Sequence, residues 1–113
     1  MADHIVTTKK NTIKTYAGKT TMKQIWKYKL KMVDGVQEIE MPSGAEIIHA
    51  DFQNKKPYIW AMINGTAEKT VRKLQIFGTG EVVYQEELVE DKSMKHISTS
   101  VINNYVWHIF EIL

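Results

Sequence analysis

The chain has 113 residues, of which 43% are hydrophobic and 25% are charged, and it contains no cysteine. This length allows one domain with a single core, and the composition is that of an ordinary globular protein rather than a disordered chain. The lack of cysteine excludes disulfides, thiolate metal sites and cysteine nucleophiles. No apolar run approaches the roughly 20 residues that span a bilayer, and MADHIVTTKK lacks the apolar core of a signal peptide. We therefore expect a cytoplasmic protein.

Positive charge is concentrated in the first third of the chain. Residues 1–35 contain eight lysines against Asp3 and Asp34, a net charge of +6, and the remaining residues carry a net charge of −4. A basic segment can contact phosphate groups, which the acidic remainder would repel, and the alternative is a solvated, solubilising lysine face. The candidate residues for nucleic-acid binding are Lys23, Lys27, Lys29 and Lys31.

Residues 1–21 contain single apolar residues without a period, which predicts a flexible basic arm with one weak strand at Ile13–Tyr16. Residues 22–113 form the predicted compact domain. Its first segment, Met22–Met32, alternates apolar residues with lysines, as in a strand with one buried and one solvated face. A lysine row is also typical of an edge strand, which must not pair with another chain. The apolar positions are Trp26, Tyr28, Leu30 and Met32.

Asp34-Gly35 separates this segment from Val36–Met41, where Glu38 and Glu40 alternate with apolar residues. Asp-Gly between two alternating segments predicts a β-hairpin with a type I′ turn, because both central residues of that turn need positive φ. Such a hairpin would place the lysine row opposite the glutamate row and form favourable cross-strand charge pairs.

Five further strands are predicted downstream, with turns at residues 42–44, 54–57 and 103–104. Tyr58–Ile63 is apolar on both faces, which predicts a central strand with something packed against each face, as in a sandwich, a barrel or an oligomer interface. Residues 81–95 fit either an exposed helical turn or a long acidic loop, and we expect a strand followed by a loop. The other strands are Glu46–Gln53 (Ile48, Ala50 and Phe52 on one face, Ile47, His49 and Asp51 on the other), Val71–Phe77, Ile97–Ile102 and Tyr105–Ile112. The predicted fold is all-β, a single small antiparallel β-sandwich or barrel of six to seven strands.

Gly78-Thr79-Gly80 follows a predicted strand, where glycines either cradle a phosphate or turn the chain. A phosphate-binding glycine loop leads into a helix whose N-terminal N–H groups complete the site. Here Glu81-Val82-Val83-Tyr84 follows, which favours a strand and begins with a carboxylate, and the Walker lysine is missing. The glycines therefore predict a tight turn or a bulge at a strand end.

The histidines are candidate metal ligands. His49 and Asp51 lie two residues apart on one strand face, but a third ligand cannot be assigned, so no metal or cofactor is predicted. His108 lies within a predicted strand, where a hydrogen-bonded structural histidine is expected. The chain has no G-x-S-x-G nucleophile elbow. Without an enzyme signature, we expect a protein that is not an enzyme.

Six aromatic residues fall in predicted strands: Trp26, Tyr28, Tyr58, Trp60, Tyr105 and Trp107. Three tryptophans in so small a domain typically form the core. An exposed one would instead mark a binding site, because aromatic rings near lysines stack on bases or other flat ligands. The candidate residues for binding a ligand or partner are Trp60, His49, Asp51, Arg72, Thr79 and His108.

Six segments in order resemble a family of short proteins encoded by bacteriophages and prophages: IWKYKL (Ile25–Leu30), EMPSGAEIIH (Glu40–His49), QNKKP (Gln53–Pro57), IWAMI (Ile59–Ile63), IFGTG (Ile76–Gly80) and VWHIFE (Val106–Glu111). The family shares W-K-Y-x-L, M-P-x-G-A, L-W-A-x-V, F-G-T-G and V-W-H-V-F-E. The resemblance spans about Met22 to Glu111. It implies a phage origin, a compact β domain and expression in the cytoplasm of the host bacterium, and it brings no catalytic residues.

The first functional hypothesis is a non-enzymatic accessory binding protein of phage type. It would counteract host defence or host metabolism, either by masking a host protein or by sequestering a small nucleotide-like ligand. The doubly apolar strand favours a homo-oligomer, in which a ligand pocket can form between subunits. The alternatives are a nucleic-acid-binding β module that uses the basic N-terminal region and a structural component of the virion.

Overall fold

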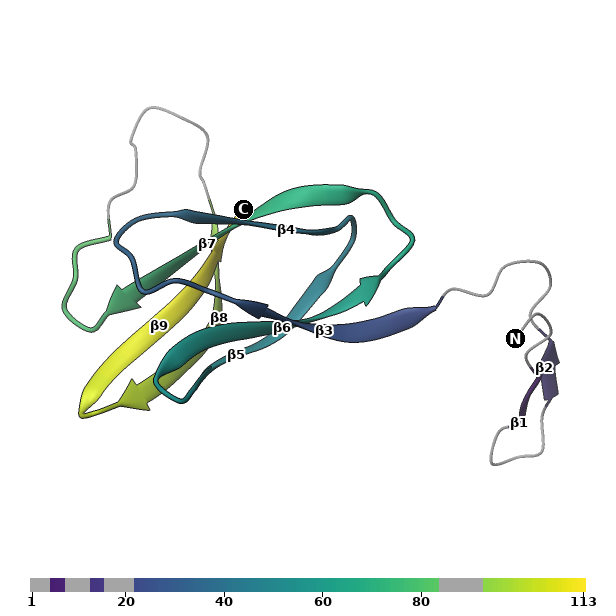
Figure 1. Cartoon of the computed structure of the whole chain (residues 1–113), viewed down its shortest axis with the longest axis horizontal. Coiled ribbons are helices and arrows are strands. Elements are labelled where there is room, and N and C mark those ends of the chain that lie inside the picture. Colours follow the sequence, from purple (N-terminus) through teal and green to yellow (C-terminus); the bar gives the residue numbers. More distant parts are fainter. Residues whose placement is uncertain (1–4, 8–12, 16–21, 84–92) are drawn as a thin grey trace.

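The computed structural model describes residues 5–7, 13–15, 22–83 and 93–113. These residues form nine strands and no helix (Figure 1). β1 (Ile5–Thr7) and β2 (Ile13–Thr15) pair antiparallel with each other. The other strands are β3 (Lys23–Lys29), β4 (Gln37–Pro42), β5 (Glu46–Gln53), β6 (Lys56–Asn64), β7 (Lys69–Gly78), β8 (Met94–Ile102) and β9 (Tyr105–Ile112). The all-β prediction is confirmed. In the described part of the chain, no helix is long and apolar enough to cross a membrane.

The seven strands from β3 to β9 form two antiparallel sheets that make a small β-sandwich. One sheet has the order β3-β6-β5 and the other β4-β7-β9-β8. β6 is central and β3 is an edge strand, as their sequences predicted. The two sheets cover each other on one face, and their inward side chains form one core.

The core is aliphatic rather than aromatic. Its most deeply buried side chains are Leu30, Met41, Ile59, Ile63, Leu74 and Ile109. Of the three tryptophans, Trp107 packs against this core, whereas Trp26 is 39% exposed and Trp60 lies half-buried on the other face of its sheet. The expectation of a tryptophan core is therefore wrong for two of the three. The alternation of β6 explains Trp60, since Ile59 and Ala61 on either side of it face inward.

The predicted hairpin at Asp34-Gly35 is wrong, because β3 and β4 belong to different sheets. Residues 30–36 cross from one sheet to the other. Leu30 buries its side chain, and the Gln37 side-chain amide bonds both the N–H and the C=O of Lys31, at 2.9 and 2.8 Å. Only Gly35 of the Asp-Gly pair has positive φ, at 83°, so the turn is not type I′.

The predicted charge pairing between the lysine row and the glutamate row is wrong for the same reason. The lysines of β3 lie opposite β6, whereas Glu38 and Glu40 of β4 lie opposite Lys73 and Val71 of β7. Among the described residues, the lysine row of β3 therefore lies beside β6 and not beside the strand that carries Glu38 and Glu40.

Two-residue turns with positive φ at both positions form at two other places. Asn54-Lys55 joins β5 to β6, with φ of 51° and 65°, and Asn103-Asn104 joins β8 to β9, with φ of 50° and 68°. Asparagine tolerates this left-handed conformation better than most residues. The predicted turns are confirmed, although the first is shorter than expected, because β6 begins at Lys56.

The edges β5 and β8 meet at one side of the sandwich, and each carries a β-bulge. Ile48 is the extra residue in β5 and Ile97 in β8. The N–H of Ala50 donates to Ser98 Oγ at 3.1 Å, which joins the two sheets. Because of the bulge, the two faces of β5 differ from the prediction. Ile47 and Ala50 are buried, whereas Ile48 is 44% exposed.

The segment after β7 differs in part from its prediction. Residues 81–83 are not in a strand, residues 84–92 lie outside the described residues, and β8 begins at Met94, earlier than expected. The turn predicted at Gly78-Thr79-Gly80 is confirmed. The N–H of Glu81 donates to the Gly78 carbonyl at 3.1 Å, and Gly80 has a φ of 94°. The Glu81 carboxylate lies against Gly78, which further disfavours a phosphate there.

Candidate functional site

The outward face of the three-stranded sheet gathers aromatic and basic side chains. Directly opposite residues in antiparallel strands project to the same face. The register gives three rows across β3, β6 and β5: Lys29-Tyr58-Asp51, Lys27-Trp60-His49 and Ile25-Met62-Glu46. Lys23 continues the β3 side, opposite Asn64. We call these residues the aromatic face.

The centre of the aromatic face is a pair of rings with a lysine above them. The Lys27 ammonium lies 4.0 Å from the Tyr58 ring centroid and 5.7 Å from that of Trp60. The two ring centroids are 6.3 Å apart, and the His49 ring is 5.7 Å from Trp60. Lys27 Nζ also donates to Gln53 Oε1, which holds it across the sheet. A cation over aromatic faces is stabilised by their quadrupoles.

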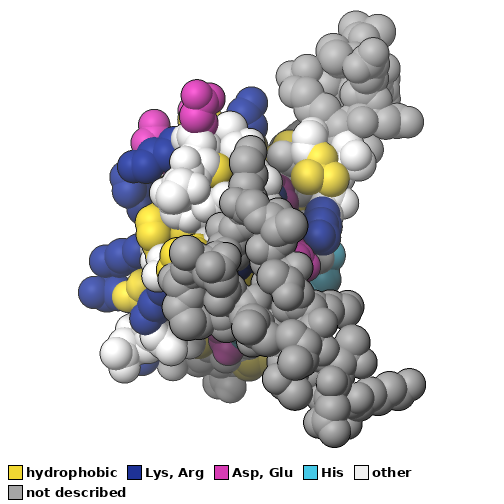
Figure 2. All heavy atoms as spheres, turned by 90° about the vertical axis from the view of Figure 1, so that its right-hand side faces the viewer, with side chains coloured by type: hydrophobic (Ala, Val, Ile, Leu, Met, Phe, Trp, Pro, Cys, Tyr) yellow, Lys and Arg dark blue, Asp and Glu magenta, His cyan; other side chains and the backbone are white. Residues whose placement is uncertain are grey.

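Charge is distributed unequally across this face. The β3 side carries Lys23, Lys27 and Lys29, whereas the β5 side carries Asp51 and Glu46 together with His49. Figure 2 shows the molecule from one end, with Lys and Arg side chains along one edge and a histidine beside a further basic side chain at the opposite edge. The aromatic rings thus lie between a cationic and an acidic border.

Asp51 is held in place by two hydrogen bonds. Its Oδ1 accepts from the backbone N–H of Phe52 at 2.7 Å and from Ser100 Oγ of β8 at 2.9 Å. Its Oδ2 lies 3.8 Å from His49 Nε2. The pKa of Asp51 is lowered below its ordinary value, mainly by the Phe52 hydrogen bond, although partial burial acts in the opposite direction.

This lowered pKa predicts a pH dependence of stability. Because the folded pKa lies below the unfolded one, ionised Asp51 stabilises the fold above about pH 4, and the contribution is lost as pH falls through the folded pKa. Asp51→Asn should therefore lose less stability than the wild type between about pH 7 and about pH 2. Urea unfolding at both pH values measures the difference. Equal losses in the two proteins would contradict it.

A second polar cluster lies on the outward face of the four-stranded sheet. His108 Nε2 is 2.7 Å from Thr79 Oγ1, and its Nδ1 is 2.9 Å from Thr99 Oγ1. Thr99 Oγ1 is also 2.8 Å from His96 Nε2. The structure thus confirms the expected hydrogen-bonded histidine and brings Thr79 and His108 together. Each ring nitrogen of His108 already has a hydroxyl partner, which fits a structural role.

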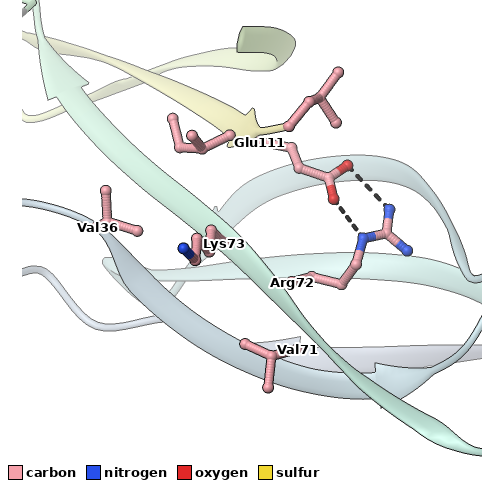
Figure 3. A pocket seen from close by; sticks show the side chains of 7 residues that line it. Val36, Val71, Arg72, Lys73 and Glu111 are labelled. Atoms are coloured by element: carbon pink, nitrogen blue, oxygen red, sulfur yellow. Dashed lines mark hydrogen bonds and ion pairs between the residues drawn. The ribbon is translucent and has the colours of Figure 1, made fainter. Parts of the chain in front are cut away.

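A pocket of about 590 Å³ lies near the end of β7 and β9 (Figure 3). Its wall is mainly apolar, and it contains the ion pair between Arg72 and the buried Glu111. Arg72 donates through Nε and Nη2 to the two carboxylate oxygens, and through Nη1 to the Ala45 carbonyl at 2.7 Å. Arg72 thus joins β7 to β9 and to the β4–β5 turn. Because these bonds use its Nε, Nη1 and Nη2 donors, Arg72 is engaged within the protein rather than placed to bind an anionic ligand.

The six predicted binding residues therefore fall in three places. His49, Asp51 and Trp60 share the aromatic face, Thr79 and His108 share the second cluster, and Arg72 lies in the ion pair. Three of the lysines proposed for nucleic acid, Lys23, Lys27 and Lys29, join the first group. Lys31 follows β3 in the crossover. The prediction from sequence did not include Tyr58, Thr99, His96 or Glu111 as site residues.

Within residues 5–7, 13–15, 22–83 and 93–113, no three histidine, aspartate or glutamate side chains are placed to hold one ion. His49 and Asp51 do share a face, as predicted from their spacing, but the third group beside them is Trp60.

The fold and the site define a small β-sandwich protein with an aromatic and basic sheet face. A family model with the description "Domain of unknown function (DUF7352)" matches residues 22–112, and the chain belongs to this family. Neither a curated protein nor a solved structure matches the chain. The family description specifies no activity, so function has to be inferred from the geometry of the site.

Proposed function

We propose that this protein is a non-enzymatic binding protein whose aromatic face takes a nucleotide-like ligand. The observation that carries the proposal is the Lys27 ammonium positioned over Tyr58 and Trp60, with further lysines beside it on the edge strand. A nucleotide has a flat ring and an anionic phosphate, and this face offers a partner for each. The ligand is either a free nucleotide or a residue of a single strand.

The physical basis is stacking combined with charge neutralisation. Aromatic side chains stack on any base because every base has a π-face, and lysines along the same groove attract the backbone phosphates. Tyr58 and Trp60 are half-buried. The Lys27 ammonium lies over the Tyr58 ring, so a base that stacks there takes the place of the ammonium. Residues two apart on a strand project side by side, which allows two rings to contact successive groups of one ligand.

The remaining parts of the functional hypothesis are proposals that rest on the sequence alone. They are the phage origin, the action against host defence or metabolism, the masking of a host protein, the cytoplasmic location and self-association. A ligand bound on the aromatic face is compatible with either sequestration of a nucleotide signal or binding of a nucleic acid. Purified protein examined by native mass spectrometry would identify a retained ligand by its mass.

Trp60→Ala tests the stacking role. We expect it to weaken binding of a nucleoside monophosphate or a short single-stranded oligonucleotide by about 5- to 160-fold, since stacking on one ring is worth about 1–3 kcal/mol. Isothermal titration calorimetry provides the dissociation constants. Trp26→Ala is the matched control, because Trp26 lies on the same sheet but projects to its opposite face, and we expect no change in its affinity. Absence of any binding by the wild type would overturn the proposed function.

A further inference from the structure

We infer that Asp51 determines base specificity on the aromatic face and makes guanine the preferred base. This inference rests on the proposed function. It is carried by the row Lys29-Tyr58-Asp51, which places a cation, a ring and a carboxylate side by side across three strands.

The row has the same order of chemical groups as a nucleotide lying across the strands. Neighbouring strands are about 4.8 Å apart, so Lys29 and Asp51 lie about 10 Å apart on either side of Tyr58. A phosphate next to the lysines of β3 leaves the base over the rings of β6, where it takes the place of the Lys27 ammonium. The outer edge of the base then points toward β5, where Asp51 and His49 project. The opposite orientation would bring the phosphate next to Asp51 and Glu46, which repel it.

The Asp51 carboxylate has one oxygen committed and one available. Oδ1 accepts both hydrogen bonds, from Phe52 and Ser100, which fix the plane of the carboxylate. Asp51 Oδ2 lies 3.8 Å from His49 Nε2, a separation that is too long for a hydrogen bond. An ionised carboxylate only accepts hydrogen bonds, so Oδ2 selects a base edge that donates.

Guanine matches such an acceptor better than the other bases. Its Watson–Crick edge has two adjacent donors, the N1–H and the N2 amino group. Adenine and cytosine each place an amino donor beside a ring nitrogen that accepts, and uracil has one donor between two carbonyl oxygens. A carboxylate facing these three edges meets at least one lone pair, which costs electrostatic energy in a partly desolvated site.

The test compares GMP, AMP, CMP and UMP on the wild type and on Asp51→Asn by calorimetry at about pH 7. We expect the wild type to bind GMP about tenfold or more tighter than the others, in line with the discrimination of other base contacts. Asparagine keeps an acceptor for Phe52 and Ser100 but presents an amide donor outward. The guanine preference should therefore disappear, because GMP binds more weakly and AMP, which no longer faces a carboxylate, binds as tightly as before or tighter.

Glu38→Gln is the matched control, because Glu38 lies on β4 in the other sheet, opposite Lys73 and outside the aromatic face. It removes the same charge and should keep the guanine preference. A second control is the urea midpoint of Asp51→Asn at about pH 7, which shows whether the variant is folded under the assay conditions. A guanine preference that survives in folded Asp51→Asn overturns the assignment of Asp51.

Two outcomes separate this inference from the proposed function. Equal affinity of the wild type for all four nucleotides overturns guanine specificity and leaves the proposed function intact. No binding of any nucleotide or oligonucleotide overturns both. An oligo-uridine with one guanine, compared with the all-uridine strand, identifies the source of the ligand. If the guanine-containing strand binds tighter than GMP and with a steep salt dependence, the ligand is a single strand. If it binds no tighter than GMP, the ligand is a free nucleotide.

Discussion

Arg72→Met is expected to lower the free energy of unfolding by about 3–5 kcal/mol, because it removes the partner of a buried carboxylate. Glu111 is 4% exposed, and both of its oxygens accept hydrogen bonds from Arg72. The variant also leaves the Ala45 carbonyl without its Arg72 donor. Domains of this kind have a total stability of about 5–15 kcal/mol, so the loss is a large fraction of it. Urea unfolding at about pH 7 measures the change.

Two further variants test whether the unpaired charge is the cause. Lys73→Met changes the next residue of β7, whose side chain is exposed, and we expect its effect to stay within about 0.5 kcal/mol. The double variant Arg72→Met/Glu111→Leu removes both charges together and should recover much of the lost stability, as replacement of buried ion pairs by apolar residues does elsewhere. A double variant as unstable as Arg72→Met alone would show that the ion pair is not the reason.

The local features of the fold were readable from the sequence because they depend on neighbouring residues. The period of two identified the strands, and the asparagine pair at residues 103–104 identified a turn that needs positive φ. Asp34-Gly35 predicted the wrong pairing strand for β3, because a turn motif in the sequence does not specify which strand the preceding one pairs with. There, burial of Leu30 and the bonds from Gln37 to the Lys31 backbone direct the chain into the other sheet.

The candidate site was predicted in fragments, and the fragments join only through long-range pairing. His49 and Asp51 share a face by their spacing, and the lysines of β3 share one by the same rule. Nothing local places Lys27 next to Trp60, since these residues meet through the register of β3 with β6. Arg72 was a candidate binding residue in the sequence, and its partner Glu111 lies on β9, much later in the chain.

β6 poses a separate problem, because its sequence is apolar on both faces and does not indicate which face is the core. In the structure, the side chains of the odd-numbered residues of β6 face the core. Ile59 is fully buried, whereas Trp60 and Met62 are half-buried on the aromatic face. The strand is central as predicted, but the expected packing on both sides is not seen: in the described residues, its outward side chains have neighbouring strand residues beside them and no second layer over them.

Ile59→Ala and Met62→Ala are therefore expected to differ sharply, although both remove an aliphatic side chain from the same strand. Ile59→Ala leaves a cavity in the core and should cost about 2–5 kcal/mol of unfolding free energy. Met62→Ala removes a partly solvated side chain, and we expect a loss of no more than about 1 kcal/mol. Urea unfolding of the two variants and the wild type provides the comparison. Similar losses would mean that the aromatic face is covered in solution, by another copy or another partner, and then its rings would not be free to stack on a ligand.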